Sequence, residues 1–331
     1  MKGRGTMIEL KRLCVVLAAS CPLFTDAVCL AADQYPNRPI RMIVGFAPGG
    51  SLDLIARILA KHLTESFDKT VLVDNRPGAN GIIGTEITAK SLPDGYTLML
   101  VDAPHAINPF VYPNAKYDPV GDFAPISLVA SAPVVLAVNP KVAAQSVRDF
   151  VANAKAQPGR ITMASGGSGG ISHVGGELFQ IKAGIKLNHI PYKGSGPALA
   201  DVVAGQSDSI FSPAPAAAPL IRGGKLRALA VSSRRRSPAI PDAPTFDEAG
   251  FTDFYVSNWY GLLAPAGTPQ DIVALLNRDV VAAVRSPDVK ERFDNALLEP
   301  ATNSPQEFVA FLQAEAARWS QLIRALGIKA Q

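Results

Sequence analysis

The fold is decided by residues 40–67, which read IRMIVGFAPGGSLDLIARILAKHLTESF. The first five residues are apolar apart from one arginine, and they predict a buried strand. Apolar residues from Leu52 to Leu63 recur at helical spacing and predict a helix over residues 51–67. A strand joined to a helix by a small-residue loop is typical of α/β proteins with parallel sheets.

The same alternation of strand and helix continues along the chain. Further strands are expected over residues 70–74, 96–101, 161–164, 209–211 and 226–231, and helices over residues 81–91, 146–156, 171–183 and 195–204. Pro133 interrupts an apolar run at residues 126–138, which predicts two strand-like halves. In the helical last third, Thr268-Pro-Gln-Asp271 and Ser304-Pro-Gln-Glu307 match capping boxes. The sequence therefore predicts an α/β fold with mostly parallel sheets.

The composition excludes several classes of protein. The 331 residues are 48% hydrophobic and 18% charged, which is typical of a folded chain rather than a disordered one. The formal net charge is only +4, and no long basic run is present, so nucleic-acid binding is not expected. The three arginines at residues 234–236 are expected in a solvated loop.

The N-terminal residues have the pattern of an export signal. A basic pair at residues 11–12 precedes a short apolar stretch, and small residues follow it. We expect residues 1–32 to be a signal peptide, cleaved near Ala31 or Ala32. A lipid anchor at Cys21 is disfavoured because the usual leucine three residues earlier is missing. The stretch is also too short to span a bilayer, which needs about 20 apolar residues.

Removal of this segment changes the charge and the cysteine content. Residues 1–32 contain four basic residues, two acidic residues and all three cysteines, so the remaining 299 residues carry a net charge of +2 and no cysteine. We expect a soluble protein outside the cytoplasm, without disulfides.

Two glycine-rich loops precede predicted helices, at residues 46–51 and 165–170. The first turn of a helix has unpaired N–H groups and a partial positive charge. Glycine lets a ligand approach these groups closely, and serine adds a hydroxyl donor. Each loop is therefore a candidate anion site without a charged side chain, and it suits a carboxylate as well as a phosphate.

Other motifs fit less well. Neither loop has the lysine of a phosphate-binding P-loop. The segment Gly166-Gly-Ser168-Gly-Gly170 matches a hydrolase nucleophile elbow, but His173 and His189 follow too closely for the usual order. A secreted hydrolase that uses Ser168 remains a minor alternative. His173 and Glu177 form half a metal site without further ligands, so no metal, cofactor or catalytic residue is expected.

Short segments spread over the chain resemble one family. These are Tyr35-Pro-Asn-Arg-Pro-Ile40, Phe46-Ala-Pro-Gly-Gly50, Asn75-Arg-Pro-Gly-Ala79, Pro93-Asp-Gly-Tyr96, Asp122-Phe-Ala-Pro125, His189-Ile-Pro-Tyr-Lys-Gly194, Gly224-Lys-Leu-Arg-Ala-Leu229, Pro241-Asp-Ala-Pro-Thr245 and Gly261-Leu-Leu-Ala-Pro-Ala-Gly267. In this order they resemble extracytoplasmic solute receptors of the Bug family, the substrate-binding proteins of tripartite tricarboxylate transporters.

The resemblance implies a two-lobed periplasmic-binding-protein fold of the Venus-flytrap, type II-like kind. Residues 33–128 plus 258–331 would form lobe 1, and residues 129–257 would form lobe 2. The chain would cross between the lobes near residues 126–134 and 256–262. The expected protein is a monomer and no enzyme; it captures a small carboxylate and delivers it to integral membrane transporter subunits.

The resemblance also implies the residues that bind a di- or tricarboxylate, an amino acid or an aromatic acid. Loop residues would bind through backbone amides and ordered water. They are Pro48, Gly49, Gly50, Ser51 and Asp53 in lobe 1, and Ser165, Gly167, Ser168, Gly169, Gly170 and His173 in lobe 2.

Several positions depart from the family pattern and are expected to line the far end of the pocket. Ser212 stands where an aspartate is common, Gly170 where a threonine is common, and Asp102 lies before the segment that contains His105. Asp53 and Asp102 could accept a hydrogen bond from an ammonium or a hydroxyl group. Tyr192, which lies in the motif at residues 189–194, is also expected to bind the ligand. Phe46, Trp259 and Tyr260 either stack on an aromatic ligand or pack in the core. A receptor that signals to a partner protein is the main alternative to transport.

Overall fold

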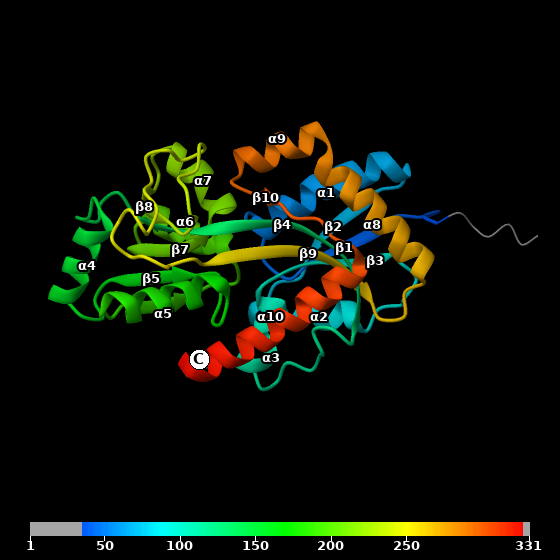
Figure 1. Ribbon diagram of the computed structural model, residues 1–331, viewed down its shortest axis with the longest axis horizontal. Helices are drawn as coiled ribbons and strands as arrows, with labels where there is room; N and C mark the ends of the chain where they lie inside the picture. Colours follow the sequence, from blue (N-terminus) through cyan, green and yellow to red (C-terminus); the bar gives the residue numbers. More distant parts are fainter. Residues whose placement is uncertain (1–34, 327–331) are drawn as a thin grey trace, which may run out of the picture. The chain divides into compact units, whose positions relative to one another are not determined.

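The computed structural model describes residues 35–326, and the signal peptide expected at residues 1–32 lies outside this range. Two groups of strands, which we call the first and second lobes, share two long strands that run between them (Figure 1). The first lobe begins with three parallel strands in the order β2-β1-β3. They are β1 (Ile40–Val44), β2 (Val71–Asn75) and β3 (Thr97–Asp102). The α/β class expected from the sequence is confirmed.

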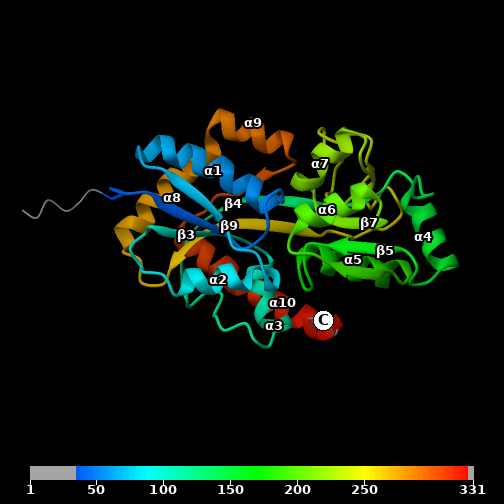
Figure 2. The same ribbon diagram turned by 180° about the vertical axis from the view of Figure 1, so that it is seen from behind.

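Helices cover both faces of the sheet in the first lobe (Figures 1 and 2). They include α1 (Ser51–Phe67), the short 3-10 turn η1 (Ala79–Gly81), α2 (Ile82–Ala89) and α3 (Pro104–Val111). The helix expected over residues 51–67 is confirmed, and its apolar face is fully buried from Ile55 to Leu63. Helix α3 was not predicted, because it is short and contains a second proline at Pro109.

The two shared strands are β4 (Phe123–Val138) and β9 (Ser257–Pro265), which pair antiparallel. The break predicted at Pro133 is wrong, because β4 is continuous. Pro133 is the last β4 residue paired with β9, and β7 and β8 take over as partners from Val134 onward. A proline lacks an N–H, so it is tolerated at this change of partner.

The second lobe adds parallel strands β5 (Thr162–Ser165), β6 (Asn188–Pro191) and β7 (Ser209–Pro213), together with β8 (Arg227–Val231). Its helices are α4 (Val147–Ala156), α5 (Ile171–Ala183), α6 (Ser195–Ala204) and α7 (Ala214–Arg222). Strand β4 pairs antiparallel with β7, β8 and β9. The expectation of mostly parallel sheets is therefore wrong, since every ladder to a shared strand is antiparallel.

The C-terminal part of the described chain returns to the first lobe with α8 (Gln270–Arg285), α9 (Pro287–Asn295), β10 (Glu299–Pro300) and α10 (Pro305–Leu326). The capping box at Ser304 is confirmed, since its backbone N–H and that of Glu307 are each bonded to the other side chain. The box at Thr268 is wrong, because the Thr268 hydroxyl donates to the carbonyl of Pro265.

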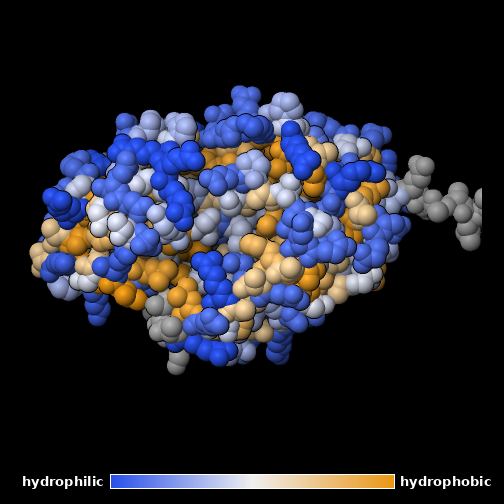
Figure 3. All heavy atoms as spheres, in the orientation of Figure 1, coloured by the Kyte–Doolittle hydropathy of each residue, from blue (hydrophilic) through white to orange (hydrophobic). Residues whose placement is uncertain are grey.

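The surface seen in Figure 3 is mostly hydrophilic, with apolar residues scattered between charged ones. Among the described residues, no helix combines the length and the apolar character that a membrane crossing requires.

Candidate ligand-binding site

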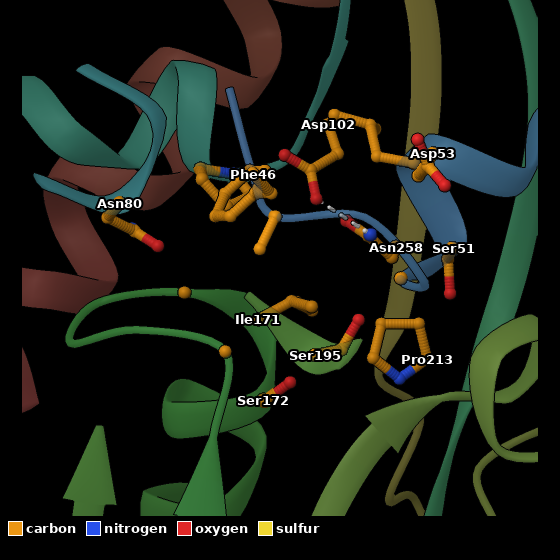
Figure 4. Close-up of a pocket in the computed structure, with 16 residues that line it drawn as sticks. Phe46, Ser51, Asp53, Asn80, Asp102, Ile171, Ser172, Ser195, Pro213 and Asn258 are labelled. Carbon is orange, nitrogen blue, oxygen red and sulfur yellow. Dashed lines mark hydrogen bonds between the residues drawn. The ribbon is translucent and has the colours of Figure 1, made fainter. Parts of the chain in front are cut away.

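A cavity lies between the loops that precede α1 and α5, and its empty space, including the open mouth, is about 430 Å³ (Figure 4). Its lining combines two carboxylates with hydroxyls, amides, backbone and apolar groups, and contains no Lys, Arg or His among the described residues. The lining residues are Phe46, Ala47, Gly50, Ser51, Leu52, Asp53, Asn80, Asp102, Pro104, Gly166, Gly170, Ile171, Ser172, Ser195, Pro213 and Asn258.

Helix α1 begins at this cavity. Its N-cap residue, Gly50, has an extended backbone. Glycine has no side chain that could accept a hydrogen bond from the N–H groups of the first helical turn. Gly49 has φ +85, a conformation that favours glycine. The buried Ser51 hydroxyl has no hydrogen-bond partner among the described residues. The helix therefore offers backbone N–H groups, a hydroxyl and the positive end of its dipole to an anion.

Helix α5 begins on the opposite side of the cavity in the same way. Gly170 is an extended N-cap without a side-chain bond. Gly167 has φ +148, and a Cβ there would lie 2.6 Å from Oδ1 of Asn80. Glycine is therefore required where the second loop passes close to the first lobe. Two helix N-termini thus open onto one cavity, and both come from the loops predicted from the sequence.

A third helix start, at Ser195 and Gly196, lies against the first loop. A Cβ on Gly196 would lie 2.5 Å from the carbonyl oxygen of Pro48. The backbone N–H of Ala47 donates to the carbonyl of Lys193 at 3.1 Å. The two lobes therefore meet here through backbone, with no room for a side chain.

Asp102 ends β3 and points toward the cavity (Figure 4). Its Oδ2 accepts a hydrogen bond of 3.2 Å from the amide of Asn258, and no cation is paired with it among the described residues. Burial raises the pKa of Asp102 to about 7, although the bond from Asn258 opposes this rise.

Asp53, the second carboxylate, is held very differently. Burial alone would raise its pKa, but hydrogen bonds from Arg57, the N–H of Gly49 and the amide of Asn75 outweigh burial and lower it. The negative charge of Asp53 is therefore paired with groups of the protein itself, and these bonds hold the loop before α1 in place.

The histidines expected near the site are neutral and buried. Nδ1 of His173 accepts from the N–H of Gly169 at 3.0 Å, and its ring stacks on His189 with centroids 3.9 Å apart. Burial lowers the pKa of His173 to about 4. His105 packs between Tyr117 and Phe123, and burial lowers its pKa to about 4. His173 thus supports the second loop, and His105 lines a smaller cavity next to the main one.

The structure brings Phe46, Gly50, Ser51, Asp53, Asp102 and Gly170 of the expected set into the cavity lining. Pro48, Gly49, Ser165, Gly167, Ser168 and Gly169 shape the two loops behind it. Three expected residues lie elsewhere. Trp259 packs against Phe308 and Phe311 and donates to Glu315. The Tyr192 hydroxyl donates to Asp201. Ser212 is buried and donates to the carbonyl of Pro213.

Sequence reasoning missed ten of the lining residues: Ala47, Leu52, Asn80, Pro104, Gly166, Ile171, Ser172, Ser195, Pro213 and Asn258. Ser195 carried the same signal as the two chosen loops, since it opens a helix after a glycine. Asn258 could have been found from strand periodicity, because alternate residues of β9 face opposite sides and Trp259 was chosen instead.

The geometry does not assemble a hydrolase centre at Ser168. Among the described residues, the hydrogen bond at Ser168 is made by its backbone carbonyl, which accepts from the hydroxyl of Tyr112 at 2.7 Å. His173 uses Nδ1 for Gly169 rather than for a serine hydroxyl. The nucleophile-elbow match is therefore a consequence of a glycine-rich loop.

Comparisons with known proteins agree over almost the whole chain. The model of the tripartite tricarboxylate transporter family receptor matches residues 55–328. Protein BugT of Bordetella pertussis is 40% identical over 324 residues, which cover 97% of this chain and 99% of that protein.

Two solved structures show the same fold. An R. palustris protein with adipate is 34% identical, with a TM-score of 0.87, over 90% of this chain and 100% of that one. The periplasmic binding protein BugD is also 34% identical, with a TM-score of 0.86, over 90% of this chain and 100% of that one. The two-lobed periplasmic-binding-protein fold expected from the sequence is thereby confirmed.

Proposed function

Because this chain belongs to the tripartite tricarboxylate transporter family of receptors, which bind solutes and are not enzymes, we propose that it captures a small carboxylate between its lobes. It then delivers this ligand to the integral membrane subunits of a transporter. The observation that carries the proposal is the convergence of the N-termini of α1 and α5 on one cavity. The adipate bound by the R. palustris relative supports the same ligand class.

Carboxylate binding follows from the donors at the cavity. N–H groups at two helix starts and the hydroxyls of Ser51, Ser172 and Ser195 can surround an anion without a lysine or arginine. The described lining contains no cationic side chain that would lose its counter-ion when the ligand leaves. Ligand exchange therefore does not require a cationic side chain of this lining to be hydrated.

The mechanism is closure of the lobes around the ligand. The bond from Ala47 to Lys193 and the contact of Gly196 with Pro48 join the lobes at the cavity edge. A ligand that touches both loops favours this arrangement by its greater affinity for it. The membrane subunits would recognise the closed form.

We place the lobes at residues 33–128 plus 258–331 and at residues 129–257, with hinges near 126–134 and 256–262. The change of β4 partners after Pro133 supports the first hinge. We further propose that the protein is a periplasmic monomer, exported by a signal peptide cleaved near Ala31 or Ala32.

Isothermal titration calorimetry tests the binding site. A panel of aliphatic, amino and aromatic acids should give at least one ligand with an affinity of order micromolar, within the usual range for small ligands. Gly169→Val should abolish its binding, because a Cβ there meets Val111 at 2.8 Å and φ is +73. Gly175→Ala, which makes only ordinary contacts of 3.5 Å or more, is the matched control. Failure of the whole panel would refute carboxylate capture.

Uptake by the living cell separates transport from signalling. A strain that lacks the gene should lose uptake of the acid identified by calorimetry. Normal uptake together with a changed transcriptional response to that acid would instead favour the signalling receptor.

A further inference from the structure

We propose that Asp102 selects ligands that carry an ammonium group next to a carboxylate, so that the preferred ligands are amino acids rather than unsubstituted acids. This inference rests on the proposed function, because the helix N-termini must hold the carboxylate end. It concerns the group on the carbon next to that carboxylate, which would meet the first lobe at the end of β3.

Within residues 35–326, no cationic side chain pairs with the carboxylate of Asp102. Its one side-chain donor is the amide of Asn258 at 3.2 Å, and the Oδ1 of Asn258 accepts from the N–H of Ala103 at 3.2 Å. That second bond fixes the amide so that its NH₂ faces Asp102. A partly buried carboxylate whose donors are all neutral can gain from a further donor or a cation that approaches it. The cavity is where such a group can enter (Figure 4).

The other carboxylate of the cavity provides an internal comparison. Asp53 has donors from the guanidinium of Arg57, the N–H of Gly49 and the amide of Asn75. The same lining thus contains one carboxylate that the protein neutralises and one that it does not. Only Asp102 remains available to a cationic part of the ligand.

A second acceptor faces the same cavity. Oδ1 of Asn80 is buried and has no partner among the described residues. The orientation of the Asn80 side chain is fixed by two hydrogen bonds with Asn108. Nδ2 of Asn80 donates to Oδ1 of Asn108 at 2.8 Å, and Nδ2 of Asn108 donates to the backbone carbonyl of Asn80 at 2.9 Å. The first lobe therefore presents two acceptors, Asn80 and Asp102, to which a ligand ammonium or hydroxyl can donate.

A second carboxylate on the ligand would meet no cation here. It would face the charge of Asp102 unless Asp102 took up a proton, and burial raises the pKa of Asp102 to about 7. The two ligand classes therefore differ in proton exchange near neutral pH. An ammonium displaces protons from Asp102, whereas a carboxylate requires that Asp102 gain one.

The titratable neighbours of Asp102 do not obscure this difference. Burial raises the pKa of Tyr117 and of Tyr260 well above the ordinary value, and lowers that of His105 to about 4. Asp53 stays ionised because its hydrogen bonds lower its pKa. Near pH 7, Asp102 is therefore the group in this region whose charge responds to the ligand.

Calorimetry with matched acids tests the inference. Each set keeps one carbon skeleton and changes only the group at C2, as in aspartate, malate and succinate, or phenylalanine, phenyllactate and phenylpropionate. Sets with three to six carbons cover other lengths. In the best-bound set, the amino acid should bind about tenfold or more tighter than both analogues, as a charge-assisted bond predicts. Titrations in buffers of different ionisation enthalpy at pH 7 should show proton release.

Asp102→Asn should reduce this preference to less than about threefold, because a neutral amide cannot form a charge-assisted bond with the ligand ammonium. Asp242→Asn, a change of an exposed carboxylate outside the cavity lining, should leave the preference intact. Thermal unfolding of each variant confirms that it is folded before its affinity is interpreted.

The outcomes separate this inference from the function on which it rests. Equal or tighter binding of the unsubstituted or hydroxy acid, or proton uptake on binding, overturns selection by Asp102 and leaves the carboxylate receptor standing. Unchanged preference in Asp102→Asn also overturns it. If no acid of any set binds, carboxylate capture itself fails.

Discussion

The backbone N–H of Ala47 donates a 3.1 Å hydrogen bond to the carbonyl oxygen of Lys193, and the two residues belong to different lobes. The contact lies beside Gly196, where a side chain would strike the Pro48 carbonyl. The closed cavity therefore depends on direct backbone contact between the lobes. Even a small side chain added at this contact should lower the affinity for the ligand.

Gly196→Ala should weaken ligand binding by about tenfold or more without destabilising the protein. The added Cβ would lie 2.5 Å from the Pro48 carbonyl, so the lobes cannot close fully. The residue lies in α6, where alanine is favoured over glycine by about 1 kcal/mol. Calorimetry gives the affinity, and thermal unfolding gives the stability. Full affinity in a stable variant would show that the lobes need not approach this closely.

Asp53→Asn should lower ligand affinity a few-fold and reduce the free energy of unfolding by about 1 kcal/mol, the usual contribution of a hydrogen bond. The change removes the ion pair with Arg57 and weakens the bond from Gly49 that shapes the loop before α1. Because Arg57 is 55% exposed, most of the effect should come from the loop rather than from the charge. Asp288→Asn, at another helix-surface pair, is the control. A variant with normal affinity would mean that the loop holds its shape without Asp53.

Asp102→Asn should change how stability depends on pH. The folded pKa of Asp102, about 7, exceeds its unfolded value of about 3.9, so the folded state binds more protons between these values. The free energy of unfolding contributed by Asp102 therefore falls as pH rises from about 4 to about 7. Relative to wild type, the variant should gain on the order of a few kcal/mol over this range. Chemical denaturation at several pH values measures the difference, which should stay flat if Asp102 is ionised throughout.

The stacked pair His173 and His189 should make the protein sensitive to acid. Burial lowers the pKa of His173 to about 4 and, together with the charge of His173, that of His189 to about 3. Because an unfolded histidine has a pKa of about 6.5, stability is complete above that pH and falls as pH drops toward 4. Glutamine at both positions should flatten this decline.

His62→Gln is the control for the histidine pair, since His62 lies in α1 outside the cavity lining. It should leave the acid decline of wild type unchanged. The same decline in the double glutamine variant would assign acid sensitivity to other groups.

Local signals in the sequence predicted part of the site. Gly50 and Gly170 were found because a glycine before a helical pattern marks a helix start, whatever the rest of the chain does. The serine at residue 195 had the same signal. Such features depend only on neighbouring residues, and this explains why the loops were placed correctly.

Long-range contacts explain what the sequence did not reveal. Asn258 reaches Asp102 only because β9 returns beside β3 after the chain has built the second lobe. Asn80 adopts a left-handed conformation with φ +53, which asparagine tolerates. The presence of an asparagine in the sequence does not predict this conformation. The continuity of β4 through Pro133 likewise depends on which strands happen to flank it. These relationships are set by topology, which periodicity along one segment does not report.

The proposed anchoring of a carboxylate by backbone amides at α1 and α5 has an evolutionary consequence. A side-chain substitution cannot remove a backbone N–H unless it introduces proline, so these donors persist in variants that keep the shape of the two loops. Residues that would face the rest of the ligand, such as Asp102 and Asn80, can then change independently of these amides. In the proposed receptor, the donors for the carboxylate and the residues that select the rest of the ligand can therefore change separately.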